Sequence, residues 1–127
     1  MIKVEFRPLI TRQMLRNEPD KIFLFGDNLL KVGLGGQAAE MRGEPNAIGI
    51  PTKRAPSMSP ESFFSDDDYI DNIRAIDDAI GSIPPGKIIV LPQYGLGTGR
   101  ANLQQKAPRT YEYIQNKLNE IEQQGDK

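Results

Sequence analysis

Hydrophobic residues recur with two different periods along this chain. Four short segments are apolar at alternate positions or almost throughout, as in strands that are half or wholly buried. They are residues 2–6, 21–25, 46–51 and 87–92. In the other segments, apolar residues recur every three or four positions, which is the spacing of one face of an α-helix. The pattern therefore predicts four strands that alternate with helices.

Four helices are expected, and glycine or proline marks where most of them stop. They fall within residues 10–20, 37–42 and 66–80 and in the segment that carries Tyr111, Ile114, Leu118 and Ile121 on one face. The third is the clearest, because Ile70, Ile73 and Ile80 share a face and the aspartates at residues 66–68 favour its start. The polar residues 122–127 are expected to form a frayed tail.

Strands and helices in this order are typical of an α/β sandwich around a mostly parallel or mixed central sheet. The chain of 127 residues is long enough for one domain, and we expect a single domain over residues 1–127. Sheets of this class bind ligands in crevices outside the carboxyl ends of their strands. Functional residues are therefore expected at that edge.

Two glycine-rich segments fall at this edge of the predicted fold. The first, GLGGQAA at residues 33–39, and the second, GLGTGRA at residues 95–101, each follow a strand and precede a helix. Such turns expose backbone N–H groups close to a helix N-terminus, where a phosphate binds readily. Two of them on one edge would suit a diphosphate, whereas the simpler alternative is that both are only tight turns. Neither matches a Walker sequence or a complete G-x-G-x-x-G dinucleotide motif.

The composition limits the chemistry that this edge can perform. The chain has no histidine and no cysteine, so the commonest general base and a thiolate nucleophile are absent. Any reaction must use Lys, Asp, Glu, Asn, Tyr, Ser or Thr, or backbone groups. We expect no metal site and no cofactor, and the aspartates at residues 66–68 are interpreted as stabilising a helix start rather than binding a metal.

Charge and hydropathy narrow the range of partners. A net charge of −1 argues against broad attraction to nucleic acid or to anionic membranes, although it leaves room for a local basic patch. The longest apolar runs are far too short to span a membrane, and the N-terminal residues lack the apolar core of a signal peptide. We therefore expect a cytoplasmic protein with no membrane partner.

Three stretches of the chain resemble the macrodomain family, in the order in which that family has them. Residues 23–43, FLFGDNLLKVGLGGQAAEMRG, resemble its first ligand loop, and residues 88–103, IIVLPQYGLGTGRANL, resemble its second. Between them, IGIPTKRAPSMSPESF at residues 48–63 is similar to the apolar strand, Thr-Lys pair and polar loop of one branch. That branch contains the terminal ADP-ribose glycohydrolase and the antitoxin macrodomains that reverse DNA ADP-ribosylation. The resemblance implies a macrodomain-like three-layer α/β/α fold, trimmed at its C-terminus.

The resemblance also implies a ligand, which is ADP-ribose or an ADP-ribosylated macromolecule, with nucleic acid only as a modified substrate. The first glycine-rich segment would hold the distal ribose and one phosphate, and the second would hold the diphosphate. The ligand-binding residues that it implies are Asn28, Gly33, Gly35, Gly36, Gln37, Thr52, Tyr94, Gly95, Gly97, Thr98, Gly99 and Arg100. Lys53 matches the family's catalytic lysine, which attacks the anomeric carbon or stabilises the opened sugar.

One departure from the family concerns the catalytic acid. Protein-directed glycohydrolases have an acidic residue in the second loop, where this chain has Gly99, and Asp27 is the candidate to replace it. A neighbouring cation, for which Arg54 is the candidate, would lower the pKa of Lys53 and make its amine a usable nucleophile. Lys53, Arg54 and Arg42 together could attract an anionic ligand.

Simpler interpretations stay open for these residues. Asp27 and Asn28 are ordinary turn residues, and Lys53 could be merely solvated. Arg100 could form a surface ion pair, and Tyr94 could pack in the core. Three functions follow: a hydrolase of ADP-ribosyl linkages, a non-catalytic module that binds ADP-ribose or another nucleotide, and a protein-interaction domain.

Overall fold

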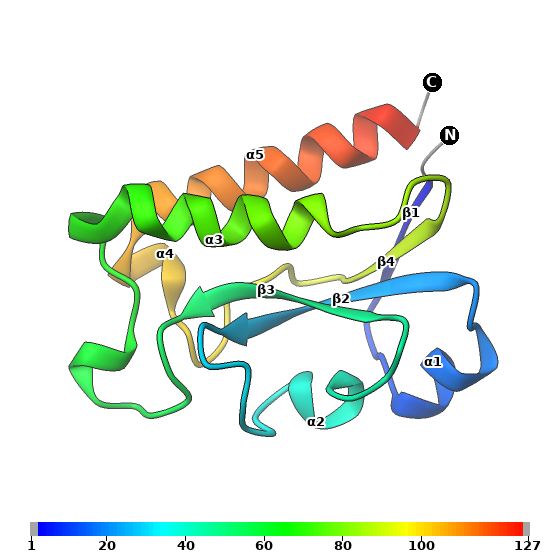
Figure 1. Cartoon of the computed structure of the whole chain (residues 1–127), viewed down its shortest axis with the longest axis horizontal. Helices are drawn as coiled ribbons and strands as arrows, with labels where there is room; N and C mark the ends of the chain where they lie inside the picture. The colour runs from blue at the N-terminus through cyan, green and yellow to red at the C-terminus, as the bar shows by residue number, and fades with distance from the viewer. Residues whose placement is uncertain (1–2, 126–127) are drawn as a thin grey trace.

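The computed structural model describes residues 3–125, and its centre is a four-stranded sheet (Figure 1). The strands are β1 (Lys3–Arg7), β2 (Lys21–Asn28), β3 (Ala47–Lys53) and β4 (Ile88–Pro92). Their order across the sheet is β1-β4-β2-β3, and each neighbouring pair is parallel. The α/β prediction is therefore confirmed, and the sheet is parallel rather than mixed.

Helices cover both faces of this sheet (Figure 1). One face carries α1 (Arg12–Asn17) and α2 (Ala38–Met41), and the other carries α3 (Tyr69–Gly81), α4 (Leu103–Lys106) and α5 (Pro108–Gly125). Each face has its own apolar core. The chain thus forms three layers, with the sheet in the middle.

The central strand β2 shows why its sequence is apolar at successive positions. Ile22 and Leu24 pack into the core that contains residues of α3 and α5. Phe23 and Phe25 pack into the opposite core, which contains residues of α1 and α2. A strand that is buried on both faces needs apolar side chains in both directions, so it does not show the alternation of a half-exposed strand.

The helices differ from their predicted bounds at several ends. The helix expected over residues 37–42 covers only Ala38–Met41, and the one expected over residues 66–80 starts with a 3₁₀ turn, η2 (Asp66–Asp68), before α3 begins. The sequence pattern does not predict η1 (Pro60–Ser62) or α4, because elements of three or four residues are too short to show a period. The tail expected to fray at residues 122–127 is helical as far as Gly125, and its last two residues lie outside the described part. No helix among residues 3–125 is long and apolar enough to cross a membrane.

Asp66 stabilises a different helix from the one that its sequence position suggests. Its carboxylate accepts hydrogen bonds from the backbone N–H groups of Arg109 (2.9 Å) and Thr110 (3.1 Å) and from the Thr110 hydroxyl (3.0 Å). These residues open α5, so Asp66 caps α5 across the fold rather than α3. Within the described residues, no group of three or more acidic, histidine or cysteine side chains could hold a metal ion.

Four charged side chains form a network that joins β1, the C-cap residue of α1 and the first residue of β2. Arg7 donates to both carboxylate oxygens of Glu18 (2.6 and 2.7 Å) and to Glu5 (2.9 Å). Lys21 donates to Glu18 (2.9 Å) and to Glu5 (3.2 Å). The Arg7 hydrogen bonds, followed by that of Lys21, lower the pKa of Glu18 from its ordinary value of 4.5 to about 2. The network therefore stabilises the fold only while Glu18 is ionised.

We expect Glu18→Gln to lower the free energy of unfolding at pH 7 by about 1 kcal/mol, because a partly exposed ion-pair network is screened by solvent. A carboxylate with a lowered pKa stabilises the folded state above its unfolded pKa and loses this contribution as the pH falls through its folded pKa. The difference from wild type, measured by chemical denaturation, should therefore shrink between pH 5 and pH about 2.

Glu120→Gln is the matched control, since Glu120 is mostly exposed and lies 3.7 Å from Lys117. It should change the stability by less than about 0.5 kcal/mol. A destabilisation by Glu18→Gln that is the same at pH 2 and pH 7 would contradict this account of the network.

Candidate functional site

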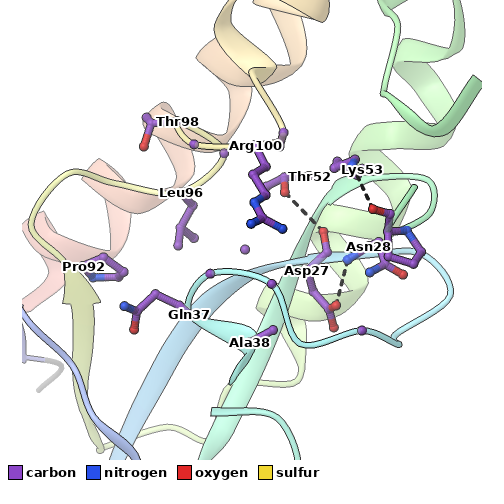
Figure 2. A pocket seen from close by; sticks show the side chains of 18 of the residues that line it. Asp27, Asn28, Gln37, Ala38, Thr52, Lys53, Pro92, Leu96, Thr98 and Arg100 are labelled. Carbon is purple, nitrogen blue, oxygen red and sulfur yellow. Dashed lines mark hydrogen bonds between the residues drawn. The ribbon is translucent and has the colours of Figure 1, made fainter. Parts of the chain in front are cut away.

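A cavity of about 410 Å³ opens at the carboxyl edge of the sheet, between the two glycine-rich segments (Figure 2). It is lined by every predicted catalytic and ligand-binding residue: Asp27, Asn28, Gly33, Gly35, Gly36, Gln37, Thr52, Lys53, Tyr94, Gly95, Gly97, Thr98, Gly99 and Arg100. The prediction that both segments lie at one edge is confirmed. Of the predicted basic group, Arg42 lines the cavity and Arg54 does not. The sequence did not predict the lining residues Pro56, Val32, Leu34, Pro92 and Leu96 individually.

Most backbone N–H groups of the two glycine-rich segments have no acceptor in the part of the protein that the structure describes, the exceptions being those of Ala38, Ala39 and Gly95. Among the described residues, no hydrogen bond within the protein uses the N–H groups of residues 33–37 or 96–101. The turns are held by other bonds, such as those from Ala38 N–H to Gly35 C=O (3.2 Å) and from Leu103 N–H to Gly97 C=O (2.9 Å). Unpaired N–H groups beside a cavity are donors for a bound anion.

Gly97 shows why the second segment requires glycine. Its backbone φ angle is +80°, in a region that residues other than glycine rarely adopt. A Cβ atom at this position would also lie 3.0 Å from the Leu103 side chain and 3.3 Å from that of Thr52. Gly99, in contrast, has open space where its Cβ would stand. Position 97 therefore requires glycine, whereas a side chain at position 99 would have room beside the cavity.

Lys53 ends β3 and is 93% buried, with a relative exposure of 7%. Its ammonium group donates to the backbone carbonyls of Ser57 (2.7 Å) and Pro56 (3.4 Å) and lies 4.7 Å from the centre of the Phe63 ring. Burial, and next the positive charge of Arg100, lower the pKa of Lys53 below its ordinary value of 10.5. The interpretation of Lys53 as a merely solvated lysine is therefore wrong.

The cation that acts on Lys53 is Arg100, so the expectation that Arg54 plays this part is wrong. Arg54 points away to form an exposed ion pair with Asp68 (3.0 Å). Arg100 is exposed and, within the described residues, pairs with no carboxylate. Figure 2 shows its side chain pointing from the second glycine-rich segment into the space between the two segments. Its Nη1 would lie 3.1 Å from a Cβ on Gly35 in the first segment, so the guanidinium reaches across the cavity.

The expectation that Arg42 contributes a free positive charge, together with Lys53 and Arg54, is also wrong. It forms a bidentate ion pair with Asp27, with distances of 2.5 Å and 3.1 Å. The Asp27 carboxylate, which also accepts from the Asn28 N–H (2.8 Å), is thus already engaged. These contacts favour Asp27 as a partner that holds Arg42 rather than as a general acid.

Three other predicted residues differ in their burial: Thr52 and Asn28 are buried, whereas Tyr94 is exposed. Thr52 is buried, and its hydroxyl donates to the Asp27 carbonyl (3.2 Å), so it supports the cavity wall. Asn28 is also buried, donates from Nδ2 to the Val32 carbonyl (2.7 Å) and has no partner for Oδ1 in the described structure. Tyr94 is 57% exposed, so the alternative of core packing is wrong for this residue. Its ring is available at the mouth of the cavity.

A family model covers residues 5–117, which is most of the chain and includes every residue of this site. It describes a family of unknown function, DUF7831. The chain belongs to this family. No curated protein and no solved structure matches the chain significantly. The function of this chain must therefore be inferred from the residues that line its cavity.

The placement of Arg100 predicts how Lys53 should respond to its removal. Because the positive charge of Arg100 is one cause of the lowered pKa, Arg100→Gln should raise the pKa of Lys53 toward its ordinary value. Burial remains in the variant, so the pKa should still stay below 10.5. An NMR titration of the ¹³Cε resonance of Lys53 measures this directly.

Arg54→Gln is the control, since the Arg54 guanidinium is paired with Asp68. It should leave the pKa of Lys53 unchanged. If Arg54→Gln raised this pKa and Arg100→Gln did not, the assignment of the neighbouring cation would be reversed.

Proposed function

We propose that this protein is a macrodomain-like module that binds ADP-ribose or a related nucleotide in the cavity between its two glycine-rich segments. One observation carries the proposal: residues of both segments line the same cavity with backbone N–H groups that have no acceptor among residues 3–125, together with the Arg100 guanidinium, which pairs with no carboxylate there. Such donors suit a diphosphate, because N–H groups and a guanidinium both bind phosphate oxygens. The resemblance of residues 23–43, 48–63 and 88–103 to macrodomain motifs supports the same ligand.

The rest of the cavity suits the other parts of such a ligand. Its volume lies in the range of sites that hold small molecules. Val32, Leu34 and Leu96 supply apolar surface, and Tyr94 presents an exposed ring at the mouth. Apolar walls with a few polar groups are typical of nucleotide-sized ligands. Within this proposal, the protein acts in the cytoplasm, and nucleic acid is met only as a modified substrate.

We further propose that the bound group is released by hydrolysis of its ADP-ribosyl linkage with the help of Lys53. The amine would attack C1 of the distal ribose as the linkage to the modified molecule breaks and that leaving group takes up a proton. Water would then break the C1–N bond, which gives ADP-ribose with a hydroxyl on C1 and restores the lysine. The lowered pKa of Lys53 supports this role, since it raises the share of neutral amine.

A non-catalytic ADP-ribose reader is the second candidate, and two contacts favour it. The Lys53 ammonium is satisfied by the Ser57 carbonyl at 2.7 Å, and the Asp27 carboxylate is bound by Arg42. Gly99 stands where protein-directed glycohydrolases have an acid, so no free carboxylate is supplied from that position. The reader and the enzyme use the same cavity and differ only in turnover.

Binding is tested by calorimetric titration with ADP-ribose, with adenosine as the ligand that lacks phosphate. We expect ADP-ribose to bind and adenosine to bind at least about tenfold more weakly, because charge-assisted hydrogen bonds to the diphosphate are lost. Arg100→Glu should weaken ADP-ribose binding by more than about tenfold. Arg54→Glu, which changes an arginine outside the cavity lining, should change the affinity by less than about threefold. No heat at millimolar ADP-ribose, or equal affinity for adenosine, would contradict the proposal.

Turnover is tested with an ADP-ribosylated oligonucleotide and with a protein that is ADP-ribosylated on acidic side chains. If the enzyme proposal is right, wild type releases ADP-ribose from one of them, and Lys53→Ala abolishes release while it keeps ADP-ribose affinity within a few-fold. Lys106→Ala is the control, because Lys106 packs on the same Phe63 ring at 5.0 Å but lies outside the cavity lining. Binding without release by wild type would identify the reader, and release by Lys53→Ala would remove Lys53 from the mechanism.

A further inference from the structure

We propose that Arg42, held in place by Asp27 over Gly49, is the positioning residue that fixes the first glycine-rich segment in its ligand-binding conformation. The inference rests on the proposed function for the ligand, but its geometry is independent of the ligand's identity. It assigns a role to three residues from different elements: Asp27 in β2, Arg42 at the end of α2 and Gly49 in β3.

The guanidinium of Arg42 binds the backbone at the start of the first glycine-rich segment. Its Nε donates to the Gly33 carbonyl (2.8 Å), and Nη2 donates to the Val32 carbonyl (3.3 Å). A peptide plane contains the C=O of one residue and the N–H of the next, and it rotates as a unit. By binding these two carbonyls, Arg42 therefore sets the directions of the N–H groups of Gly33 and Leu34. Both N–H groups are free of protein acceptors in the described structure, and both residues line the cavity.

Asp27 fixes the other side of the same guanidinium. The two carboxylate oxygens accept from Nη1 and Nη2 of Arg42, and the Asp27 side chain is only 7% exposed. Arg42 also lies over the Phe25 ring, 5.6 Å from its centre. Four of the five N–H donors of the guanidinium are thus used within the protein. A planar group held on two sides has little freedom to turn, whereas a lysine ammonium could not make this set of contacts.

Gly49 provides the space that the Asp27 side chain occupies. Gly49 of β3 pairs with Phe25 of β2, two residues before Asp27 on that neighbouring strand. A Cβ atom on Gly49 would lie 2.5 Å from Oδ2 and 2.7 Å from Cβ of Asp27, far closer than real contacts allow. Gly49 does not line the cavity. A substitution there would displace Asp27 without placing any new atom against a ligand.

The first measurement uses the protein without nucleotide. Gly49→Ala and Arg42→Lys should lower the ¹⁵N order parameters of the Gly33 and Leu34 amides from the rigid range near 0.85 to below about 0.6. Amides of α5 should keep their values, which separates a local effect from general unfolding. Gly81→Ala is the matched control, because a Cβ at Gly81 meets nothing within 4 Å. Unchanged order parameters at Gly33 and Leu34 in Arg42→Lys would overturn the inference.

The second measurement is calorimetric titration of the same variants with ADP-ribose. We expect affinity to fall at least tenfold in Gly49→Ala and Arg42→Lys and to stay within twofold in Gly81→Ala. Wild-type affinity in a folded Arg42→Lys variant would overturn the inference, and this variant decides the matter if Gly49→Ala does not fold. If wild type itself does not bind ADP-ribose, the proposed function fails, while the order parameters still decide whether Arg42 positions the segment.

Discussion

Parallel pairing of the central strands is the constraint on which the site depends. Residues 21–23 of β2 pair in parallel with residues 88–90 of β4, so both strands point their carboxyl ends to the same edge. The chain leaves β2 into the first glycine-rich segment and leaves β4 into the second. Two segments about sixty residues apart in the sequence therefore meet across one cavity, and an antiparallel pairing would have placed them at opposite ends of the sheet.

The charges around this cavity are arranged so that few of them are free. Arg42 is neutralised by Asp27, and Arg54 is paired with Asp68 at the surface. Lys53 is buried with its ammonium on backbone carbonyls, and Arg100 raises the local positive potential without a carboxylate partner in the described residues. The net charge of −1 is a sum over the whole chain and does not reveal this local excess of positive charge. The cavity is therefore suited to an anion even though the protein is weakly acidic.

The sequence predicts the parts of this structure that depend on local patterns. Continuous apolar runs identify β2 and β4, and a strand that leads into glycine and then a helix identifies both segments of the site. Contacts between distant residues leave no such pattern. Asp66 looks like the start of α3 but caps α5, more than 40 residues later, because the fold brings their ends together.

The same limit applies to the chemistry of the site. Arg54 follows Lys53 in the sequence and was the natural candidate for its neighbouring cation, but adjacent residues at the end of a strand point to opposite sides. Arg100 takes that place from another loop. The pairing of Asp27 with Arg42 could not be predicted either, since it depends on the space left by Gly49 on a neighbouring strand.

The central claim is that both glycine-rich segments present their backbone N–H groups to one diphosphate. It is tested most directly by titrating ¹⁵N-labelled protein with ADP-ribose and following the amide resonances of residues 33–37 and 96–101. The account predicts that resonances in both segments shift together along one binding curve, while those of α3 and α5 stay in place. Shifts confined to one segment, or resonances unmoved at millimolar ADP-ribose, would contradict it.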